Sequence, residues 1–177
     1  RALADSRVLV VGTGAIGEAI RSRLAPFETE ITRVATTARE DEHGHIHGID
    51  ELPELLPNTD ILVLIVPLTD STRGLIGAKE LALLPDGALV VNVARGPVVD
   101  TDAITAEVVA GRLRMASDVF DPEPFPDDHP LWQADGAFIS PHIGGNTTAM
   151  LPRIVALLAD QLPRLADGRE LKFVVTS

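Results

Sequence analysis

The sequence predicts an α/β fold, a doubly wound parallel sheet of the Rossmann type with an appended C-terminal helix. Three observations predict it. Short β-rich apolar runs alternate with segments of helical character along the chain. A glycine-rich segment, Gly12–Gly17, directly follows the first of these runs. The run Asp60–Val66 is apolar after its first residue, as strands covered on both faces of a sheet are.

The first half of the chain is expected to contain four strands, one of them weak, and two helices. The expected strands are Arg7–Val11, Ile31–Thr36, the short and weak Gly44–Ile49, and Asp60–Val66. The expected helices are Ala15–Leu24 and a small one around Leu52–Leu56. Pro26 marks the end of the first helix, because proline cannot continue a helix.

The second half continues the alternation and ends in a long helix. The expected strands are Ala88–Val93, Leu113–Val119 and the short Ala137–Ser140. The expected helices are Ala78–Leu84, Asp102–Ala110 and a long one that starts near Thr147. The segment Phe120–Pro130 contains four prolines and is expected to be an irregular loop. Pro163 is expected to kink or divide the final helix.

Composition excludes several classes of function. The 177 residues suit one domain, and the formal net charge of −11 repels phosphate backbones and anionic membranes, so we expect no nucleic-acid or membrane partner. The longest apolar run, Ile61–Leu68, is too short to span a bilayer. The chain has no Cys, which excludes thiolate catalysis and fits a cytoplasmic protein, and no Tyr, which excludes the Tyr/Lys pair of short-chain dehydrogenases.

The segment Gly12-Thr13-Gly14-Ala15-Ile16-Gly17 has the GxGxxG spacing of a dinucleotide cradle. Gly12 permits a tight turn, Gly14 lets a pyrophosphate approach the backbone, and Gly17 allows close packing of helix on strand. The helix that starts at Ala15 and Ile16 offers free N–H groups and a partial positive charge to the anion. We therefore expect this segment to bind the cofactor's phosphates.

The residues after the second strand bear on the choice of cofactor. NAD enzymes usually have an acidic residue about 20 positions beyond the glycines, and here that count reaches Thr37. Thr36, Thr37 and Arg39 replace it, and hydroxyls with a guanidinium suit a 2′-phosphate. We therefore expect NADP(H) to be preferred, with NAD(H) as a second cofactor. The alternative is that Arg39 is a solvated loop cation.

Five motifs in fixed order carry a family resemblance. They are Val66-Pro67-Leu68-Thr69, Thr72-Arg73-Gly74-Leu75-Ile76, Val91-Asn92-Val93-Ala94-Arg95-Gly96, Asp118-Val119-Phe120-Asp121-Pro122-Glu123-Pro124 and Ser140-Pro141-His142-Ile143-Gly144-Gly145. With the glycine segment they cover most of the chain, and together they resemble the D-isomer-specific 2-hydroxyacid dehydrogenases, glyoxylate and hydroxypyruvate reductases among them. The resemblance implies a catalytic arginine, glutamate and histidine at Arg95, Glu123 and His142. It also implies that Asp118 meets the nicotinamide carboxamide.

The same motifs supply the remaining expected contacts to the cofactor. These are Val66, Pro67, Thr72, Val93, Ala94, Arg95, Asp118, His142, Gly144 and Gly145.

The chemistry of 2-hydroxy acid oxidation requires the same three residue types, without reference to the family resemblance. A hydride leaves C2 and a proton leaves the hydroxyl, and histidine is a base suited to both directions. A carboxylate on the other ring nitrogen, the role of Glu123, fixes the tautomer and stabilises imidazolium. Arg95 can bind the substrate carboxylate through two N–H groups. Each residue follows the carboxyl end of an expected strand, where open α/β sheets bind ligands.

Each of these residues also has a purely structural interpretation. His142 can be a turn residue, Glu123 a surface charge, and Arg95 the partner in a salt bridge that closes a strand. Three alternating histidines, His43, His45 and His47, would share one face of a strand and could bind a metal. We favour a solvated sheet edge for them and expect no metal site.

The domain organisation and the partners complete these expectations. Only eleven residues precede Gly12, so residues 1–165 would be the dinucleotide-binding domain and residues 166–177 a tail returning to a substrate domain mostly outside this chain. The expected substrate is a small 2-hydroxy or 2-oxo acid. A nucleotide-sensing, corepressor-like binding protein on the same scaffold is the alternative.

The Phe120–Trp132 loop indicates a homodimer. Apolar residues of the final helix are read as core or dimer contacts, namely Ile154, Leu157, Leu158 and Leu162.

Overall fold

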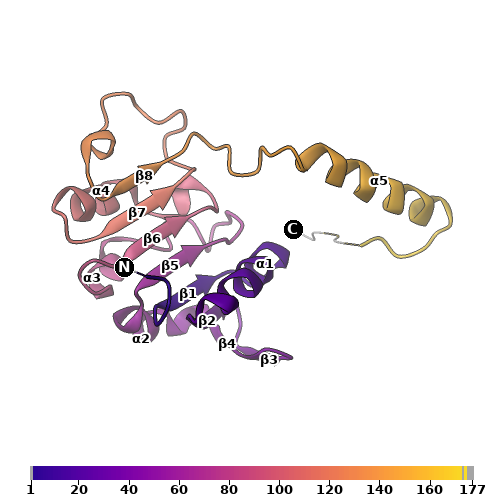
Figure 1. Cartoon of the computed structure of the whole chain (residues 1–177), viewed down its shortest axis with the longest axis horizontal. Coiled ribbons are helices and arrows are strands. Elements are labelled where there is room, and N and C mark those ends of the chain that lie inside the picture. Colours follow the sequence, from indigo (N-terminus) through magenta and orange to yellow (C-terminus); the bar gives the residue numbers. More distant parts are fainter. Residues whose placement is uncertain (1, 173, 175–177) are drawn as a thin grey trace. The chain divides into compact units, whose positions relative to one another are not determined.

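The computed structural model describes residues 2–172 and residue 174. The chain divides into two compact units, the first ending at Pro141 and the second beginning at His142. The first unit contains an eight-stranded sheet in the order β3-β4-β2-β1-β5-β6-β7-β8, shown in Figure 1. Every neighbouring pair is parallel except β3 and β4, which are antiparallel. The predicted doubly wound α/β fold is therefore confirmed.

The elements follow one another with short connections. The strands are β1 Arg7–Val11, β2 Glu30–Ala35, β3 Arg39–Asp41, β4 Gly44–Gly48, β5 Ile61–Leu64, β6 Leu89–Asn92, β7 Arg114–Ser117 and β8 Ala137–Ile139. The α-helices are α1 Ala15–Leu24, α2 Leu52–Leu55, α3 Ala78–Leu83, α4 Thr101–Val109 and α5 Met150–Ala166. The 3-10 segments are η1 Ala25–Phe27, η2 Ile49–Glu51, η3 Leu56–Asn58, η4 Gly96–Val98 and η5 Pro130–Gln133.

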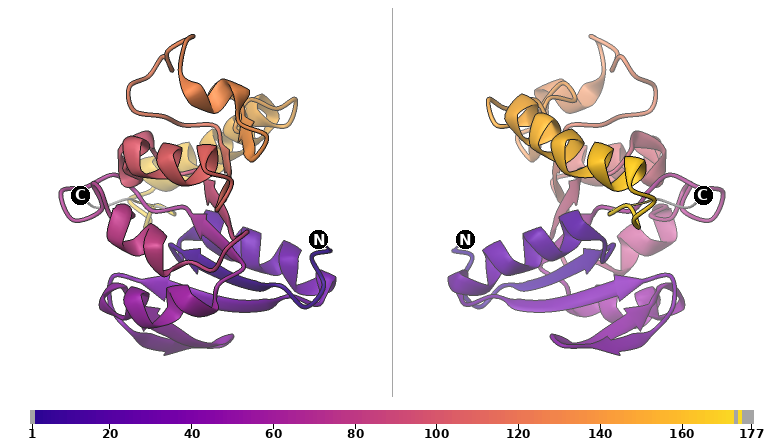
Figure 2. Two further views of the ribbon diagram at one scale, coloured as in Figure 1. Left: turned by 90° about the vertical axis from the view of Figure 1, so that its left-hand side faces the viewer. Right: turned by 90° about the vertical axis from the view of Figure 1, so that its right-hand side faces the viewer.

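Alternate residues of the central strands pack into two separate cores. The larger core joins strand residues to buried residues of α2, α3 and α4, among them Leu9, Leu62, Leu52, Leu81 and Ile104. The smaller core joins the intervening strand residues to α1, namely Val8, Val10 and Val63 with Ile20 and Leu24. The helices therefore cover both faces of the sheet, as the side views of Figure 2 show. This arrangement places the carboxyl ends of β1, β5, β6 and β7 along one edge.

The β3–β4 hairpin is the element that the sequence pattern did not reveal. β3 spans only Arg39–Asp41, and all three residues are exposed, so no apolar alternation marks it. Arg33 on β2 anchors the hairpin, because its guanidinium donates to both carboxylate oxygens of Asp41, at 2.6 and 2.8 Å, and to the Gly44 carbonyl at 3.0 Å. The Arg33 side chain is only 6% exposed, so the bidentate pair satisfies a buried charge.

The final helix differs from the prediction in three ways. It begins at Met150 instead of near Thr147, and it runs without a break through Pro163 to Ala166. Pro163 therefore does not divide the helix, although it lacks the N–H that would donate to a carbonyl of the preceding turn. None of its residues is buried in the chain, so the interpretation of Ile154, Leu157, Leu158 and Leu162 as core is wrong. None of the helices that the structure describes has the length and hydrophobicity needed to cross a bilayer.

The Arg33–Asp41 pair gives the hairpin a pH-dependent stability. The Arg33 guanidinium, with a further hydrogen bond from the His43 backbone N–H, holds the pKa of Asp41 well below its usual range. A carboxyl whose pKa is lower in the folded state stabilises the fold above its unfolded pKa, about 3.9, and this contribution is lost as the pH falls toward the folded value.

We therefore expect Asp41→Asn to lower the melting temperature at pH 7, because Arg33 loses its counter-charge. The difference from the wild type should be constant at neutral pH and should shrink as the pH falls below about 4. Thermal unfolding followed by circular dichroism measures both. The control is Glu42→Gln, since the Glu42 side chain is 86% exposed. Equal melting temperatures for Asp41→Asn and the wild type at pH 7 would contradict this account.

Candidate functional site

In the glycine segment between β1 and α1, two positions have no room for a side chain, and the third borders open space. Gly12 has φ of +117°, and a Cβ there would lie 2.6 Å from the Ile65 carbonyl oxygen. A Cβ at Gly17 would lie 1.9 Å from the Gly12 carbonyl oxygen. A Cβ at Gly14 would meet nothing within 4 Å. Gly12 and Gly17 therefore shape the turn, and the space at Gly14 fits a dinucleotide pyrophosphate.

The first turn of α1 faces this open space with backbone donors. Gly14 is the N-cap residue and provides no side-chain cap, and the first intrahelical bond runs from the Glu18 N–H to the Gly14 carbonyl. The N–H groups of Ala15 and Ile16 precede that bond and have no acceptor within the helix. Ile16 is 62% exposed. The turn therefore offers the N–H groups and the helix dipole that the phosphates of a dinucleotide require.

The β3–β4 hairpin brings Arg39 to the glycine segment. Its Nη2 donates to the Thr13 Oγ1 at 2.8 Å, and its Nη1 donates to the Thr37 carbonyl at 3.3 Å. Thr36 and Thr37 are exposed just beyond β2. Arg39 therefore belongs to a strand and not to a loop, and its guanidinium lies beside the cradle. A cation and hydroxyls at this place fit a 2′-phosphorylated ribose.

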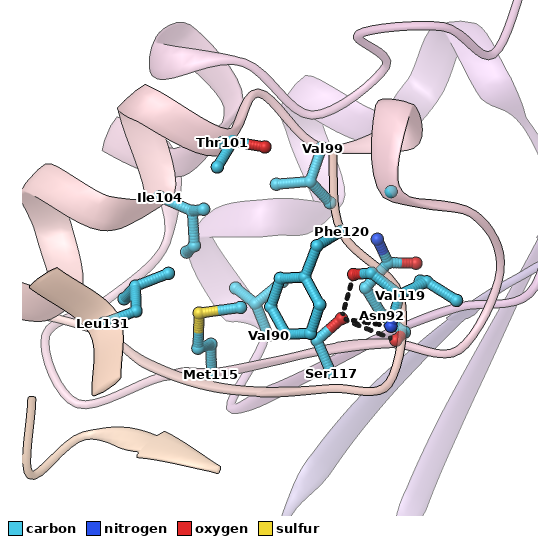
Figure 3. A pocket seen from close by; sticks show the side chains of 11 residues that line it. Val90, Asn92, Val99, Thr101, Ile104, Met115, Ser117, Val119, Phe120 and Leu131 are labelled. Atoms are coloured by element: carbon cyan, nitrogen blue, oxygen red, sulfur yellow. Dashed lines mark hydrogen bonds between the residues drawn. The ribbon is translucent and has the colours of Figure 1, made fainter. Parts of the chain in front are cut away.

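Two buried polar residues, which the sequence interpretation did not single out, hold the loop after β6. Asn92 and Ser117 are each 4% exposed. The Asn92 amide donates to the Arg95 carbonyl at 3.1 Å and accepts from the Ala94 N–H at 3.1 Å. The Ser117 hydroxyl lies 3.1 Å from the Asn92 carbonyl and 2.7 Å from that of Val119, as Figure 3 shows. A polar residue at the end of an apolar strand was the available signal for both.

The cavity beneath these loops is part of the core and not a ligand site. It measures about 20 Å³, which is room for about one water molecule. Apolar side chains such as Val90, Ile104 and Met115 line most of it, and Asn92 and Ser117 lie at its polar end (Figure 3). The space is therefore too small for a substrate and serves the packing of the loops.

The loops that carry Arg95 and Glu123 meet at Gly96. A Cβ on Gly96 would lie 1.9 Å from the Phe120 carbonyl oxygen, so only glycine fits this backbone contact. Arg95 is exposed, and its Nη1 donates to the Ala94 carbonyl at 2.6 Å. Within the part of the chain that the structure describes, no ion pair of Arg95 closes the strand. The Arg95 side chain is thus exposed immediately before this backbone contact.

Aromatic contacts fix the loop that carries Glu123. The rings of Phe120 and Phe125 stack with centroids 4.1 Å apart, and the Trp132 indole donates to the Pro126 carbonyl at 2.7 Å. The Thr101 hydroxyl donates to the Asp121 carbonyl at 2.9 Å, which ties the loop to the start of α4. Glu123 itself is exposed. The loop is thus irregular, as predicted, but anchored at both sides of Glu123.

The loop after β5 is ordered by Thr72. Its hydroxyl donates to the Pro67 carbonyl at 2.7 Å and accepts from the Thr69 N–H at 2.8 Å. The Gly74 N–H donates to the Pro97 carbonyl at 2.7 Å, which joins this loop to the one after Arg95. The predicted cofactor contacts Val66, Pro67 and Thr72 therefore belong to one compact turn beside β6.

His142 is the first residue of the second unit and follows β8 by three residues. It is exposed and has φ of +52°, in the left-handed region that non-glycine residues rarely adopt. A non-glycine residue in this region is strained and persists only where the surrounding structure imposes the conformation. Such residues cluster at functional sites. Gly144 and Gly145 follow in the same unit.

Comparison with known proteins decides the family. The family model described as D-isomer specific 2-hydroxyacid dehydrogenase, NAD binding domain, matches residues 1–144.

The chain belongs to this family.

Curated relatives within the family have several activities. Glyoxylate reductase from Thermofilum pendens is 36% identical over 162 residues, which are 90% of this chain and 48% of that protein. Formate dehydrogenase from Arabidopsis thaliana is 32% identical over 164 residues, 90% of this chain and 43% of that protein. The chain therefore spans less than half of the length of these two curated relatives.

Solved structures of 2-hydroxyacid dehydrogenases share the fold. The enzyme from Xanthobacter autotrophicus Py2, in complex with NADPH and MES, has a TM-score of 0.88 and 35% identity, covering 99% of this chain and 73% of that one. A probable 2-hydroxyacid dehydrogenase from Rhizobium etli, with NADP, HEPES and L(+)-tartaric acid, has a TM-score of 0.87 and 28% identity, covering 99% and 57%. The resemblance and the dinucleotide-binding class of this domain are confirmed.

The geometry of the cradle predicts opposite effects for two alanine substitutions. We expect Gly14→Ala to melt close to the wild-type temperature, because its Cβ meets no atom within 4 Å. The same variant should bind NADPH at least about tenfold more weakly, because that Cβ occupies the space for the pyrophosphate. Gly17→Ala should instead lower the melting temperature, since its Cβ would collide with the Gly12 carbonyl.

Thermal unfolding and titration of NADPH fluorescence measure the two effects. Wild-type NADPH affinity in Gly14→Ala, or wild-type stability in Gly17→Ala, would show that the cradle is misassigned.

Proposed function

We propose that the protein transfers a hydride between NADP(H) and a small D-2-hydroxy acid or the matching 2-oxo acid. The observation that carries this proposal is the meeting of the Arg95 and Glu123 loops at Gly96, beside a glycine cradle with room at Gly14. Family membership supports it. The curated relatives named above are enzymes, which favours a dehydrogenase over a nucleotide-sensing binding protein.

The proposed chemistry assigns one role to each residue. A bound nicotinamide would supply the acceptor for the C2 hydride in oxidation and its donor in reduction. His142 takes the hydroxyl proton as the C2–H bond breaks, and it gives that proton back to the carbonyl oxygen in the reverse direction. Glu123 orients the imidazole and stabilises its charged form. Arg95 binds the substrate carboxylate through two N–H groups, and Asp118 accepts from the nicotinamide carboxamide.

The substrate is proposed to be a small 2-hydroxy or 2-oxo acid. Glyoxylate and hydroxypyruvate both present a carboxylate next to a carbonyl, which is the group that Arg95 and His142 would hold. Glyoxylate reductase is among the relatives, and the Rhizobium etli structure holds tartaric acid, another hydroxy acid. Residues 1–165 are proposed as the dinucleotide-binding domain, with residues 166–177 as a tail toward a substrate domain; part of that tail lies outside the described residues.

A homodimer is also proposed. Exposed apolar side chains of α5 include Leu151 at 66%, Leu162 at 60% and Leu165 at 65% exposure. Such a row of apolar residues in one helix is typical of a surface that another chain covers.

The proposed role of His142 in proton transfer predicts that replacing this residue lowers the turnover rate. In the gene product that carries these residues, we expect His142→Ala to reduce turnover with glyoxylate at least about 10²-fold, with little change in cofactor affinity. Glu123→Gln should cost less and move the pH profile toward lower pH, because the imidazolium loses its anionic partner. Nicotinamide absorbance follows the rate.

His129→Ala is the control for a histidine outside the proposed site. Wild-type turnover in His142→Ala would remove His142 from the mechanism.

The contact of Arg39 with the glycine segment predicts the cofactor preference. We expect NADPH to bind more tightly than NADH, and Arg39→Ala to weaken NADPH at least about tenfold while leaving NADH nearly unchanged, because only the 2′-phosphate faces the guanidinium. Fluorescence titration of both dinucleotides measures this difference. Arg23→Ala, an exposed arginine on α1, is the matched control. A clear NADH preference, or unchanged NADPH affinity in Arg39→Ala, would reject the assignment.

A further inference from the structure

Two histidines and two glutamates gather on one face of β4, away from the residues assigned above. β4 lies between β3 and β2 in the sheet. His45 and His47 alternate with Ile46, which is 1% exposed on the opposite face, so the two imidazoles share one side of the strand. Their ring centroids are 4.5 Å apart in an edge-to-face arrangement. His43 lies outside the strand and contacts Glu18 on α1 instead, at 3.4 Å.

A carboxylate contacts each imidazole. The Nδ1 of His45 lies 2.7 Å from Oε1 of Glu40 on β3, and the Nδ1 of His47 lies 2.7 Å from Oε2 of Glu51 at the end of η2. Glu51 is itself fixed, because its Oε1 accepts from the Gly48 N–H at 2.7 Å. A carboxylate that holds a histidine ring in place is the arrangement found around metal-binding histidines.

One ligand atom from each of His45, His47 and Glu51 lies within 4.8 Å of the other two. Around a tetrahedral zinc ion, with bonds of about 2.0–2.1 Å, ligand atoms are about 3.3 Å apart. The side chains of His45, His47 and Glu51 are 48%, 27% and 34% exposed. Small rotations of these side chains cover the difference between 4.8 Å and about 3.3 Å. To bind the ion, the Glu51 Oε2 would exchange its contact with the His47 Nδ1 for the metal, while its Oε1 keeps the Gly48 N–H.

We propose that His45, His47 and Glu51 form a binding site for a late first-row divalent metal ion, with Zn²⁺ as its representative. Two imidazoles and one carboxylate are a ligand set that favours zinc, copper and nickel over the oxygen-seeking Mg²⁺ and Ca²⁺. Glu40 is the outer partner that orients His45. Solvent completes the coordination, because the cluster lies at the surface.

Such an ion would join strand β4 to η2 by bonds to side chains. β4 continues directly into η2, and the same hairpin carries Arg39 on β3, where Arg39 is opposite Ile46 and Glu40 is opposite His45. An ion that binds the folded chain and not the unfolded one raises the melting temperature. The site therefore stabilises the outer part of the sheet, and this inference does not depend on the proposed catalytic activity.

Zinc chloride titrated into the chain by isothermal calorimetry tests the proposal, with thermal unfolding as a second readout. We expect one zinc ion per chain and a higher melting temperature with zinc, and no heat from Mg²⁺. Glu51→Gln should bind zinc at least about tenfold more weakly. Glutamine can still accept from the Gly48 N–H, so this variant keeps the local fold.

His45→Gln, at a half-exposed side chain, should lose zinc affinity to the same extent as Glu51→Gln. The matched control is His43→Gln, the neighbouring histidine outside the cluster, which should bind zinc like the wild type. Three results would overturn the site: no zinc binding by the wild type, wild-type affinity in both Glu51→Gln and His45→Gln, or an equal loss in His43→Gln.

Discussion

The arrangement of the candidate site depends on one backbone contact, the approach of Gly96 to the Phe120 carbonyl. Any side chain at Gly96 would overlap that oxygen, so the loops after β6 and β7 can meet only because residue 96 is glycine. Beneath the contact, the Ser117 hydroxyl bridges the Asn92 and Val119 carbonyls, and the Asn92 amide holds the Arg95 loop. The exposed side chains of Arg95 and Glu123, the proposed catalytic residues, therefore extend from anchored loops, as a proposed site requires.

The groups that would attract the proposed ligands are opposite in sign to the net charge of the chain. The chain carries a net charge of −11, yet the proposed ligands, a dinucleotide and a carboxylic acid, are anions. Local groups must therefore attract them. Around the glycine segment these groups are the N-terminus of α1 and Arg39, while the nearby carboxylate of Glu18 is engaged by Arg21, whose guanidinium lowers the pKa of Glu18. The Arg33–Asp41 pair holds the hairpin that brings Arg39 into place.

Sequence reasoning predicted the parallel sheet and the glycine turn between β1 and α1 well, because both leave strong local signals. The apolar β5 and the GxGxxG segment are readable from residue order alone. β3 was missed because its three residues are all exposed and because Arg33, whose ion pair anchors Asp41, lies eight residues away from it. Asn92 and Ser117 were missed because their role arises between neighbouring strands. The final helix was expected to contribute apolar residues to the core or to a dimer contact; none of its residues is buried, and the sequence pattern could not separate the two because both need an apolar face.

The central claim is that this chain contains a complete dinucleotide cradle, with Gly12–Gly17 and Arg39 in position. The most direct test is isothermal calorimetry of NADPH into a polypeptide of residues 1–177 whose folding is first verified by circular dichroism. The account predicts saturable binding of one NADPH per chain. A folded chain that releases no binding heat and shows no saturation with NADPH at millimolar concentration would contradict it.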